Sequence, residues 1–502
     1  MEQWGSRLGA LLSLIGGAVG LGNFLRFPFQ AGKWGGGAFL VPYVIALIGV
    51  GLPLIWIEMA LGRAGARHGV QSAPAILHAL IGKRGWMIGL LSVYVSLSVG
   101  VYYAYLTGWT LGYTYHALLG TFSNFSLTQT VAFHEQFLER EAIIFWLLTW
   151  IIAGLILQRG LQKGLERMNL WGIPLLFLLA VGIAGGAIMV GETGRCPTCA
   201  SQVGLAYLYL PRWTELGQPA VWLAATGQVF FSIGVGFGMY PVYAAHALRS
   251  NPVREGFQTA AANTIAEVGL GGLIVIPLVT AFLGLPYVQE KASFSMGFAV
   301  MPFVLNEWGG RLLIAAWYFL LFLAALSSLL AMGWVGVTWL SASLGGSPLR
   351  WVWPLIGSLI LLGIPPIFGY QHGALDLYDQ IGGTLFPVIA ALGYWWAFHQ
   401  VKGWEILKQE SPGLLGKGWL LILRWLPPLF LGGLLGMSLF QPSAGDWVGA
   451  FRHLLHHGHW PWAPEALPAQ LQRTLFASIW NLLSGVSLIL LAGILVVLRK
   501  RA

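Results

Sequence analysis

Residues 16–23 read GGAVGLGN and place four glycines within an otherwise apolar stretch near the N-terminus. Because glycine weakens a helix interior, we expect a bilayer-spanning helix to break here. The backbone groups freed by a break cannot stay unpaired in lipid, so such a segment persists only where it is buried in protein or coordinates a ligand. A second interruption, SIGVGFG at residues 232–238, lies inside another long apolar run. Two broken helices in matching positions of two chain halves are typical of secondary transporters built from inverted repeats.

The composition excludes a soluble globule, because 57% of the 502 residues are hydrophobic and only 9% are charged. The net charge of +9 is uneven: with the N-terminus inside, most Lys and Arg fall in cytoplasmic segments. This indicates a membrane orientation with both termini cytoplasmic rather than a nucleic-acid partner. We expect no cleavable signal peptide, since the first apolar stretch is too long. Apolar runs long enough to span a bilayer number twelve, at 5–34, 38–62, 85–119, 141–158, 167–191, 218–248, 256–285, 309–343, 351–370, 375–401, 417–441 and 471–498.

Two outer loops carry residues that bind metals in other proteins. Cys196 and Cys199 form a CPTC sequence that allows a disulfide outside the cell. A histidine cluster precedes the last apolar run and consists of His453, His456, His457 and His459. Cysteines and histidines together can bind zinc, but nothing in the sequence joins the two loops. We interpret them as a local disulfide and a polar loop, with a shared metal site as the less favoured alternative.

Several further motifs occur in a fixed order along the chain. They are GAVGLGNFLRFP at 17–28, GGGAF at 35–39, PLIWIE at 53–58, LGR at 61–63, Tyr102-Tyr103, GQVFFS at 227–232, GFG at 236–238, and Asn263 with Glu267. From Trp4 to about Arg424 this set resembles the neurotransmitter:sodium symporter family, in its bacterial amino-acid transporter branch. The resemblance implies an all-α integral membrane fold of twelve transmembrane helices, with a 5+5 inverted repeat and broken helices 1 and 6. The parts would be repeat one at 1–191, an outer loop at 192–217, repeat two at 218–401, and two peripheral helices at 402–502 with an outer loop at 442–470.

The resemblance also implies two sodium ions held by oxygens, which are the ligands that a hard cation prefers. The first site would use Ala18, Asn23, Ser232 and Asn263. The second would use Gly16, Val19, Ala324, Ser327 and Ser328. Taken alone, Ser327 and Ser328 would indicate helix packing by small residues; beside the other motifs they favour the ion.

A substrate site at the breaks is implied as well. Half-helix N-termini attract a carboxylate, and the Tyr103 hydroxyl would add a hydrogen bond to it. Family members that carry decarboxylated amines hold an Asp at position 20, so Gly20 indicates a substrate with its own carboxylate. The pocket is otherwise apolar, which favours a neutral, hydrophobic amino acid; Gly234 would leave it room. Its residues would be Ala18, Gly20, Gly22, Val99, Tyr103, Phe231, Ser232, Gly234, Phe237, Ser328, Ala331 and Met332.

Gates follow from the same resemblance. Arg26 and Asp379 would close an outer gate above bound substrate, with Phe237 as the lid beneath. Snorkelling of Arg26 and capping by Asp379 are the structural alternatives. The inner side departs from the family pattern, because Met1, Ala342 and His246 occupy the positions of its charged and tyrosine residues. We therefore expect the inner gate to rely on packing of Trp4 and other polar contacts.

Two carboxylates fall at helix depth. Glu58 is expected to accept hydrogen bonds from the freed backbone of broken helix 6. Glu267 occupies the position where chloride-dependent relatives have an anion-binding Ser, so its charge would make transport independent of chloride. If Glu267 takes up a proton in the empty return state, the cycle would add proton antiport.

The function implied is sodium-coupled import of a neutral amino acid by alternating access, in a multi-pass protein of the inner (plasma) membrane. The alternative is a sodium-dependent amino-acid sensor that does not transport. A membrane enzyme is disfavoured, since no nucleophile and base or metal-ligand pattern occurs at helix depth. The partners would be a small amino acid and the lipid bilayer, with a homodimer allowed and no nucleic acid.

Overall fold

A computed structural model describes residues 2–247, 250–291, 296–368, 370, 375 and 378–439. In these ranges every regular element is a helix, and the extended structure is confined to two isolated bridges, Gly36 with Pro211 and Glu192 with Ala200. The α-helices are α1 (Arg7–Ala18), α2 (Phe27–Lys33), α3 (Gly37–Ala46), α4 (Leu52–Ala66), α5 (Ala73–Ile81), α6 (Lys83–Leu119), α7 (Leu127–Arg140), α8 (Ala142–Leu157), α9 (Arg167–Met189), α10 (Ser201–Tyr209), α11 (Pro219–Ile233), α12 (Met239–Ala245), α13 (Pro252–Thr264), α14 (Gly272–Leu283), α15 (Leu285–Lys291), α16 (Met296–Ala299), α17 (Met301–Leu344), α18 (Val352–Phe368), α20 (Phe386–Gln400), α21 (Gly403–Glu410) and α22 (Lys417–Leu439). Wider π-helical turns extend several of them, at η1 (Gly22–Arg26), η2 (Leu47–Gly51), η3 (Leu161–Glu166), η5 (Ile265–Gly271) and η8 (Asp379–Leu385), while η4 (Trp213–Gly217) and η6 (Pro348–Trp351) are 3₁₀ turns.

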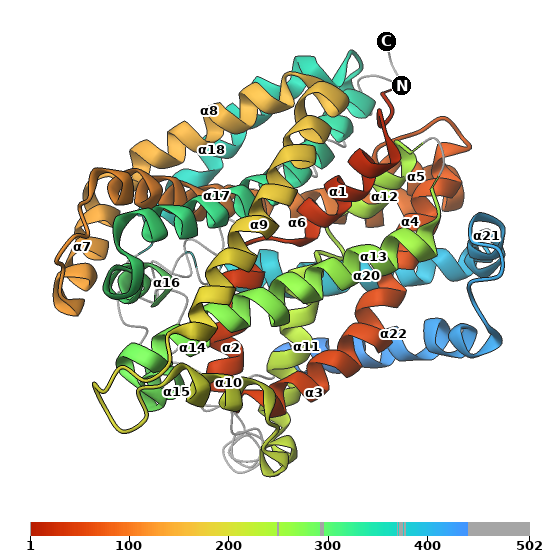
Figure 1. The fold of residues 1–502 in the computed structure, drawn as a ribbon. Helices are drawn as coiled ribbons and strands as arrows, with labels where there is room; N and C mark the ends of the chain where they lie inside the picture. The colour runs from red at the N-terminus through yellow and green to blue at the C-terminus, as the bar shows by residue number, and fades with distance from the viewer. Residues whose placement is uncertain are drawn as a thin grey trace, which may run out of the picture.

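Both glycine-rich segments interrupt their helices. α1 ends at Ala18, and the chain turns by 48° before η1 and α2 continue it. α11 ends at Ile233, and α12 begins only at Met239. Between them Gly234, Gly236 and Gly238 have φ angles of 66°, 84° and 75°, in the left-handed region that favours glycine. The two breaks predicted from the sequence are thus confirmed, and both lie inside the helix bundle (Figure 1).

Only some of the predicted membrane spans lie within the described residues. Within the described ranges, six helices are long and apolar enough to cross a bilayer, or up to eight if each bent helix pair is one span. One of them joins α16 and α17, and α17 itself contains a non-helical Gly310 that divides it in two. The twelfth apolar run, 471–498, lies outside the described residues, as do the outer loop 442–470 and its histidine cluster. The count of twelve therefore stays a prediction.

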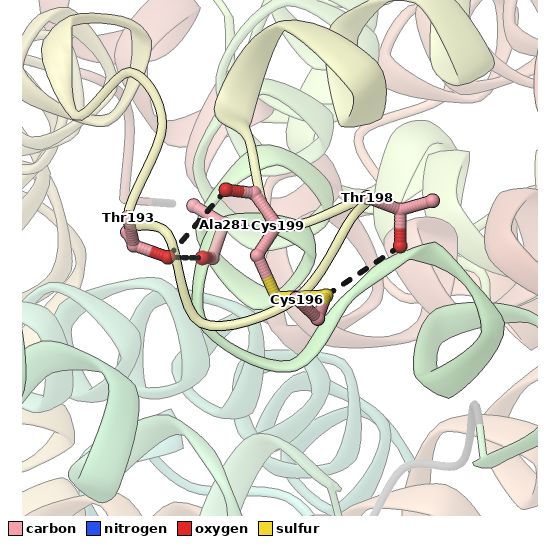
Figure 2. The surroundings of a disulfide bond; sticks show 5 residues. All are labelled: Thr193, Cys196, Thr198, Cys199 and Ala281. Atoms are coloured by element: carbon pink, nitrogen blue, oxygen red, sulfur yellow. Dashed lines mark hydrogen bonds between the residues drawn. A yellow bond between two sulfur atoms is a disulfide. The ribbon is translucent and has the colours of Figure 1, made fainter.

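The segment predicted as an outer loop, 192–217, contains the short helix α10 and the turn η4. Ahead of α10, Cys196 and Cys199 form the disulfide that the sequence allows (Figure 2). The Thr193 amide donates to the Cys199 carbonyl at 3.0 Å, and the Thr193 hydroxyl donates to the Ala281 carbonyl near the end of α14. The disulfide thus fixes a tight turn that is hydrogen-bonded to a neighbouring helix.

Candidate functional site

A small cavity of about 40 Å³ lies between the two breaks. Its wall includes eleven of the twelve residues predicted for the substrate; Ala331 is the exception. Gly17, Asn23 and Met239 line it although they were not predicted as substrate contacts. No lining side chain is charged, and the full set is Gly17, Ala18, Gly20, Gly22, Asn23, Val99, Tyr103, Phe231, Ser232, Gly234, Phe237, Met239, Ser328 and Met332.

Met239 changes the expectation for Gly234. A Cβ atom added at Gly234 would lie 2.4 Å from the Met239 Cε atom, and one added at Gly17 would lie 3.0 Å from its Sδ atom. The space that Gly234 was expected to leave for substrate is therefore occupied by a methionine side chain. Sequence reasoning missed Met239 because it begins α12, just past the break, and the quoted motif ends one residue earlier.

The oxygens predicted for the second sodium site converge on one hydroxyl. Ser328 Oγ lies 3.3 Å from the Gly16 carbonyl oxygen, 3.5 Å from that of Val19 and 3.3 Å from that of Ala324. Ser327 Oγ lies 2.9 Å from the same Ala324 oxygen. Because α1 ends at Ala18, the last carbonyls of this helix lack intrahelical partners and face α17. All five predicted residues thus contribute an oxygen to one cluster between α1 and α17.

The side chains predicted for the first sodium site bond to one another. Asn23 Nδ2 donates to Asn263 Oδ1 at 2.7 Å, and Asn263 Nδ2 donates to Ser232 Oγ at 3.2 Å. Asn23 Oδ1 accepts from the Gly20 amide at 2.8 Å. All three side chains are buried. A cation entering here would replace the direct contact between the two amides, so this arrangement differs from the one that would hold sodium.

Tyr103 and Gly20 meet where the substrate carboxylate was expected. The Tyr103 hydroxyl accepts a hydrogen bond from the Leu21 amide at 3.0 Å, and Tyr103 lines the cavity. A Cβ atom at position 20 would lie 2.5 Å from that hydroxyl and 2.9 Å from Ser328 Oγ. Only glycine fits at position 20 without displacing Tyr103.

Glu267 is fully buried and surrounded by donors. Its Oε2 atom accepts from the Tyr43 hydroxyl at 2.6 Å, from Ser232 Oγ at 3.0 Å and from Asn263 Nδ2 at 3.2 Å. Its Oε1 atom accepts from Gln228 Nε2. A site built of donors stabilises a carboxylate, because hydrogen bonds to an ionised acceptor are the strongest ones. Glu267 is in this way linked directly to two residues of the first sodium site.

Glu58, the other buried carboxylate, contacts the second break. Its Oε1 atom accepts from the Gly236 amide at 2.6 Å. This amide belongs to the unwound segment, where no helical carbonyl is available to it. The contact is the one expected for Glu58 from the sequence.

The two residues predicted for the outer gate lie apart. No ion pair joins Arg26 to Asp379 among the described residues. The Arg26 guanidinium carbon lies 4.2 Å from the centre of the Phe231 ring, and Asp379 Oδ1 accepts from the Tyr102 hydroxyl at 2.6 Å. Arg26 Nη1 is buried and has no hydrogen-bond partner. Phe237, the expected lid, lines the cavity.

The opposite end of the site is closed by the start of α1. Trp4 Nε1 donates to the Tyr243 carbonyl at 3.0 Å, and the Trp4 amide donates to the His246 carbonyl at 3.1 Å. Glu166 accepts from the Gly5 amide at 2.7 Å through Oε2 and from Ser6 Oγ at 2.8 Å through Oε1. The sequence predicted that Trp4 packs at this end, but it did not predict the contact of Glu166.

A family model described as the sodium:neurotransmitter symporter family matches residues 1–131 and 123–341. The chain belongs to this family. It is therefore a multi-pass membrane protein of a sodium-dependent transporter family, and the resemblance seen in the sequence motifs is confirmed.

Relatives in this symporter family match from 49% to 88% of the chain. A sodium-dependent transporter of Haemophilus influenzae, described as uncharacterized, is 27% identical over 416 residues, which are 78% of this chain and 87% of the relative. The human sodium-dependent neutral amino acid transporter SLC6A17 is 29% identical over 279 residues, which are 49% of this chain and 36% of the relative. The crystal structure of MhsT in complex with L-phenylalanine has a TM-score of 0.78 and 27% identity, covering 88% of this chain and 100% of that one. The helical fold, the use of sodium and the membership of a family of transporters follow from these findings.

Proposed function

We propose that this symporter imports a neutral, hydrophobic amino acid, driven by two sodium ions and independent of chloride. Alternating access would proceed around the cavity between the two breaks, in a fold of twelve spans with a five-plus-five inverted repeat. The observation that best supports this proposal is that the carbonyl oxygens of Gly16, Val19 and Ala324 converge on Ser328 Oγ. Unwound backbone that exposes several oxygens at one point in a membrane is what a desolvated sodium ion requires.

Contact between ion and substrate would explain how the two are coupled. Ser328 belongs to the oxygen cluster of the second sodium site and also lines the cavity. Asn23 and Ser232 belong to the first sodium site and line the same cavity. A bound ion and a bound carboxylate would each increase the affinity for the other, since this coupling is reciprocal.

The substrate class is proposed from the cavity wall and from one relative. A neutral side chain is favoured because none of the lining residues is charged. The carboxylate would accept from Tyr103, whose hydroxyl already accepts from Leu21 and is thereby oriented to donate. MhsT was crystallised with L-phenylalanine. Here Met239 and Met332 would adjust to the substrate, because methionine is unbranched and adapts its shape.

In the proposed orientation the protein lies in the inner membrane, with both termini in the cytoplasm. Two independent features support it. Lys and Arg concentrate on the side of the N-terminus. The disulfide lies with α10 and α15 at the other end of the molecule from the N-terminus (Figure 1), and disulfides persist in oxidising surroundings.

Sodium-driven uptake into proteoliposomes tests the proposal. A labelled neutral amino acid should accumulate when sodium is imposed outside, and should not accumulate in equimolar potassium. Ser328→Ala should abolish sodium-driven uptake, because it removes the hydroxyl that both the ion and the cavity use. Ser358→Ala, at an exposed hydroxyl on α18, is the matched control and should transport normally. Sodium-dependent binding with no uptake in the wild type would instead support a sensor on the same fold.

A further inference from the structure

A second cavity, of about 370 Å³, lies between α9 and α17 and shares no lining residue with the substrate cavity. It is bounded by the end of α8, by the turn between α8 and α9, by the first three turns of α9, and by Leu323 and Leu326 of α17. Gly172 forms part of its floor, where an added Cβ atom would lie 3.8 Å from Leu323 Cδ2. This space has no part in the transport site described above.

One end of the second cavity is cationic. Arg159, Lys163 and Arg167 line it and are exposed, and none of them forms an ion pair within the described part of the chain. Two carboxylates lie near the same turn, and both already accept hydrogen bonds from groups other than these cations. Glu166 points inward to Gly5 and Ser6, and Glu2 Oε2 accepts from the Leu161 amide at 2.8 Å.

The other end of the cavity is apolar and open to the bilayer. Trp171 is 76% exposed and Leu175 is 39% exposed, on a helix that is long and apolar enough to span a membrane. Lys163, Arg167, Trp171 and Leu175 follow one another at intervals of four residues, so they share one helix face. At 1.5 Å per residue, Trp171 lies about 6 Å and Leu175 about 12 Å deeper than Arg167.

We propose that this groove binds an anionic phospholipid, with its phosphate at Arg159, Lys163 and Arg167 and one acyl chain along Trp171 and Leu175. The order of cation, tryptophan and leucine along one face matches the order of phosphate, interface and hydrocarbon in a leaflet. Three cations without an acidic partner select a negative headgroup over a zwitterionic one. The cytoplasmic side is the leaflet on which such basic pockets bind acidic lipids. The proposal does not depend on which amino acid is transported.

The test compares lipid retention by the full-length protein. Protein in detergent is exchanged into equal amounts of phosphatidylglycerol and phosphatidylcholine, and the lipids that remain bound are counted by native mass spectrometry. The wild type should retain phosphatidylglycerol preferentially. The triple variant Arg159→Gln, Lys163→Gln, Arg167→Gln should lose this preference by about tenfold or more, since each cation near a membrane surface adds to the attraction.

A matched variant removes the same number of charges elsewhere. Lys83→Gln, Arg84→Gln and Arg350→Gln are also exposed and are predicted on the same membrane side, and this variant should keep the preference. Equal retention by the wild type and the first triple variant would overturn the proposal, and so would an equal loss in both triple variants. Displacement of the bound lipid by glycerol 3-phosphate would also overturn it, because the site would then be one for a soluble phosphate. Unchanged unfolding temperatures in both variants would show that they fold.

Discussion

At the scale of single residues, the absence of a side chain at position 20 is decisive. Gly20 brings the backbone of the first break against Tyr103 and Ser328, and a Cβ atom would approach the Tyr103 hydroxyl to 2.5 Å. Because Gly20 has no side chain, Tyr103 can approach the first break, and position 20 adds no charge to the cavity.

Gly20→Asp should abolish binding of the amino acid, because the new carboxylate would stand beside that of the substrate. The same variant should gain affinity for the corresponding decarboxylated amine, whose ammonium group it can pair. Gly20→Asn is the control, since asparagine has the same size without the charge. It should lose affinity for the amino acid and gain no affinity for the amine. Isothermal titration with the acid and the amine measures both effects. Amino-acid affinity retained by Gly20→Asp would place the carboxylate elsewhere.

Glu267 supports a second prediction at this scale. Glu267→Ser should make sodium-driven uptake depend on chloride, because the four donors would then lack a negative acceptor. Glu267→Gln should lower uptake without restoring it in chloride, since its amide would meet donors and fill the space for an anion. Uptake is measured in chloride and in gluconate. If Glu267→Ser transports equally in both, the carboxylate does not replace the anion. Any dependence of wild-type uptake on internal pH should also disappear in this variant.

At the scale of elements, the start of α1 is held by the turn before α9. Glu166 receives two hydrogen bonds from residues 5 and 6, at a helix N-terminus whose positive end favours a carboxylate. Gly9 makes this approach possible, since a Cβ atom there would lie 2.0 Å from Glu166 Oε1. This contact joins the start of α1 to η3 without an ion pair.

Glu166→Ala should release the inner half of α1, because it leaves the Gly5 amide without its acceptor. The variant removes two hydrogen bonds, each worth about 0.5–1.5 kcal/mol, so amide hydrogen exchange in the first turns of α1 should accelerate about tenfold. Gly9→Ala should have the same effect from the opposite side of the contact. Glu166→Gln keeps one acceptor, so its exchange rate should lie between those of the wild type and Glu166→Ala. Exchange as slow as in the wild type in both alanine variants would show that Trp4 alone closes this end.

Much of the arrangement could be predicted from the sequence, and the omissions share a physical cause. The glycine breaks, Ser328 and the Glu58 contact follow from local composition and from motifs. Glu166 and Met239 could not be found in this way, because their roles depend on what another helix places opposite them. Glu166 is the last residue of the π-helical turn η3 and bonds to the start of α1, and Met239 fills space only because Gly17 and Gly234 lack side chains. The separation of Arg26 from Asp379 depends on conformation, which a sequence motif does not specify.

At the scale of the whole molecule, the proposed alternating access closes the two ends in turn about the central cavity. In this structure the inner end is held by Trp4 and Glu166, while at the outer end Arg26 stacks on Phe231 and Asp379 bonds to Tyr102. The described residues thus show direct contacts at the inner end and no ion pair between Arg26 and Asp379 at the outer end.

Arg26→Ala and Asp379→Ala should each reduce transport more than equilibrium binding, since a gate governs closure while the central contacts set affinity. The double variant should be no worse than either single one if the two act as a pair. Uptake rate and substrate affinity are measured on the same preparations. Additive losses would show that the two residues act separately.

The position of Glu267 also has an electrical consequence. If Glu267 replaces chloride as proposed, its charge stays in the protein, so the positive charge of the sodium ions crosses without an accompanying anion. Each net charge moved through a potential of 100 mV contributes about 2.3 kcal/mol, roughly a fiftyfold concentration ratio. The membrane potential would then drive accumulation together with the sodium gradient, and currents recorded during uptake should report the number of charges carried per substrate.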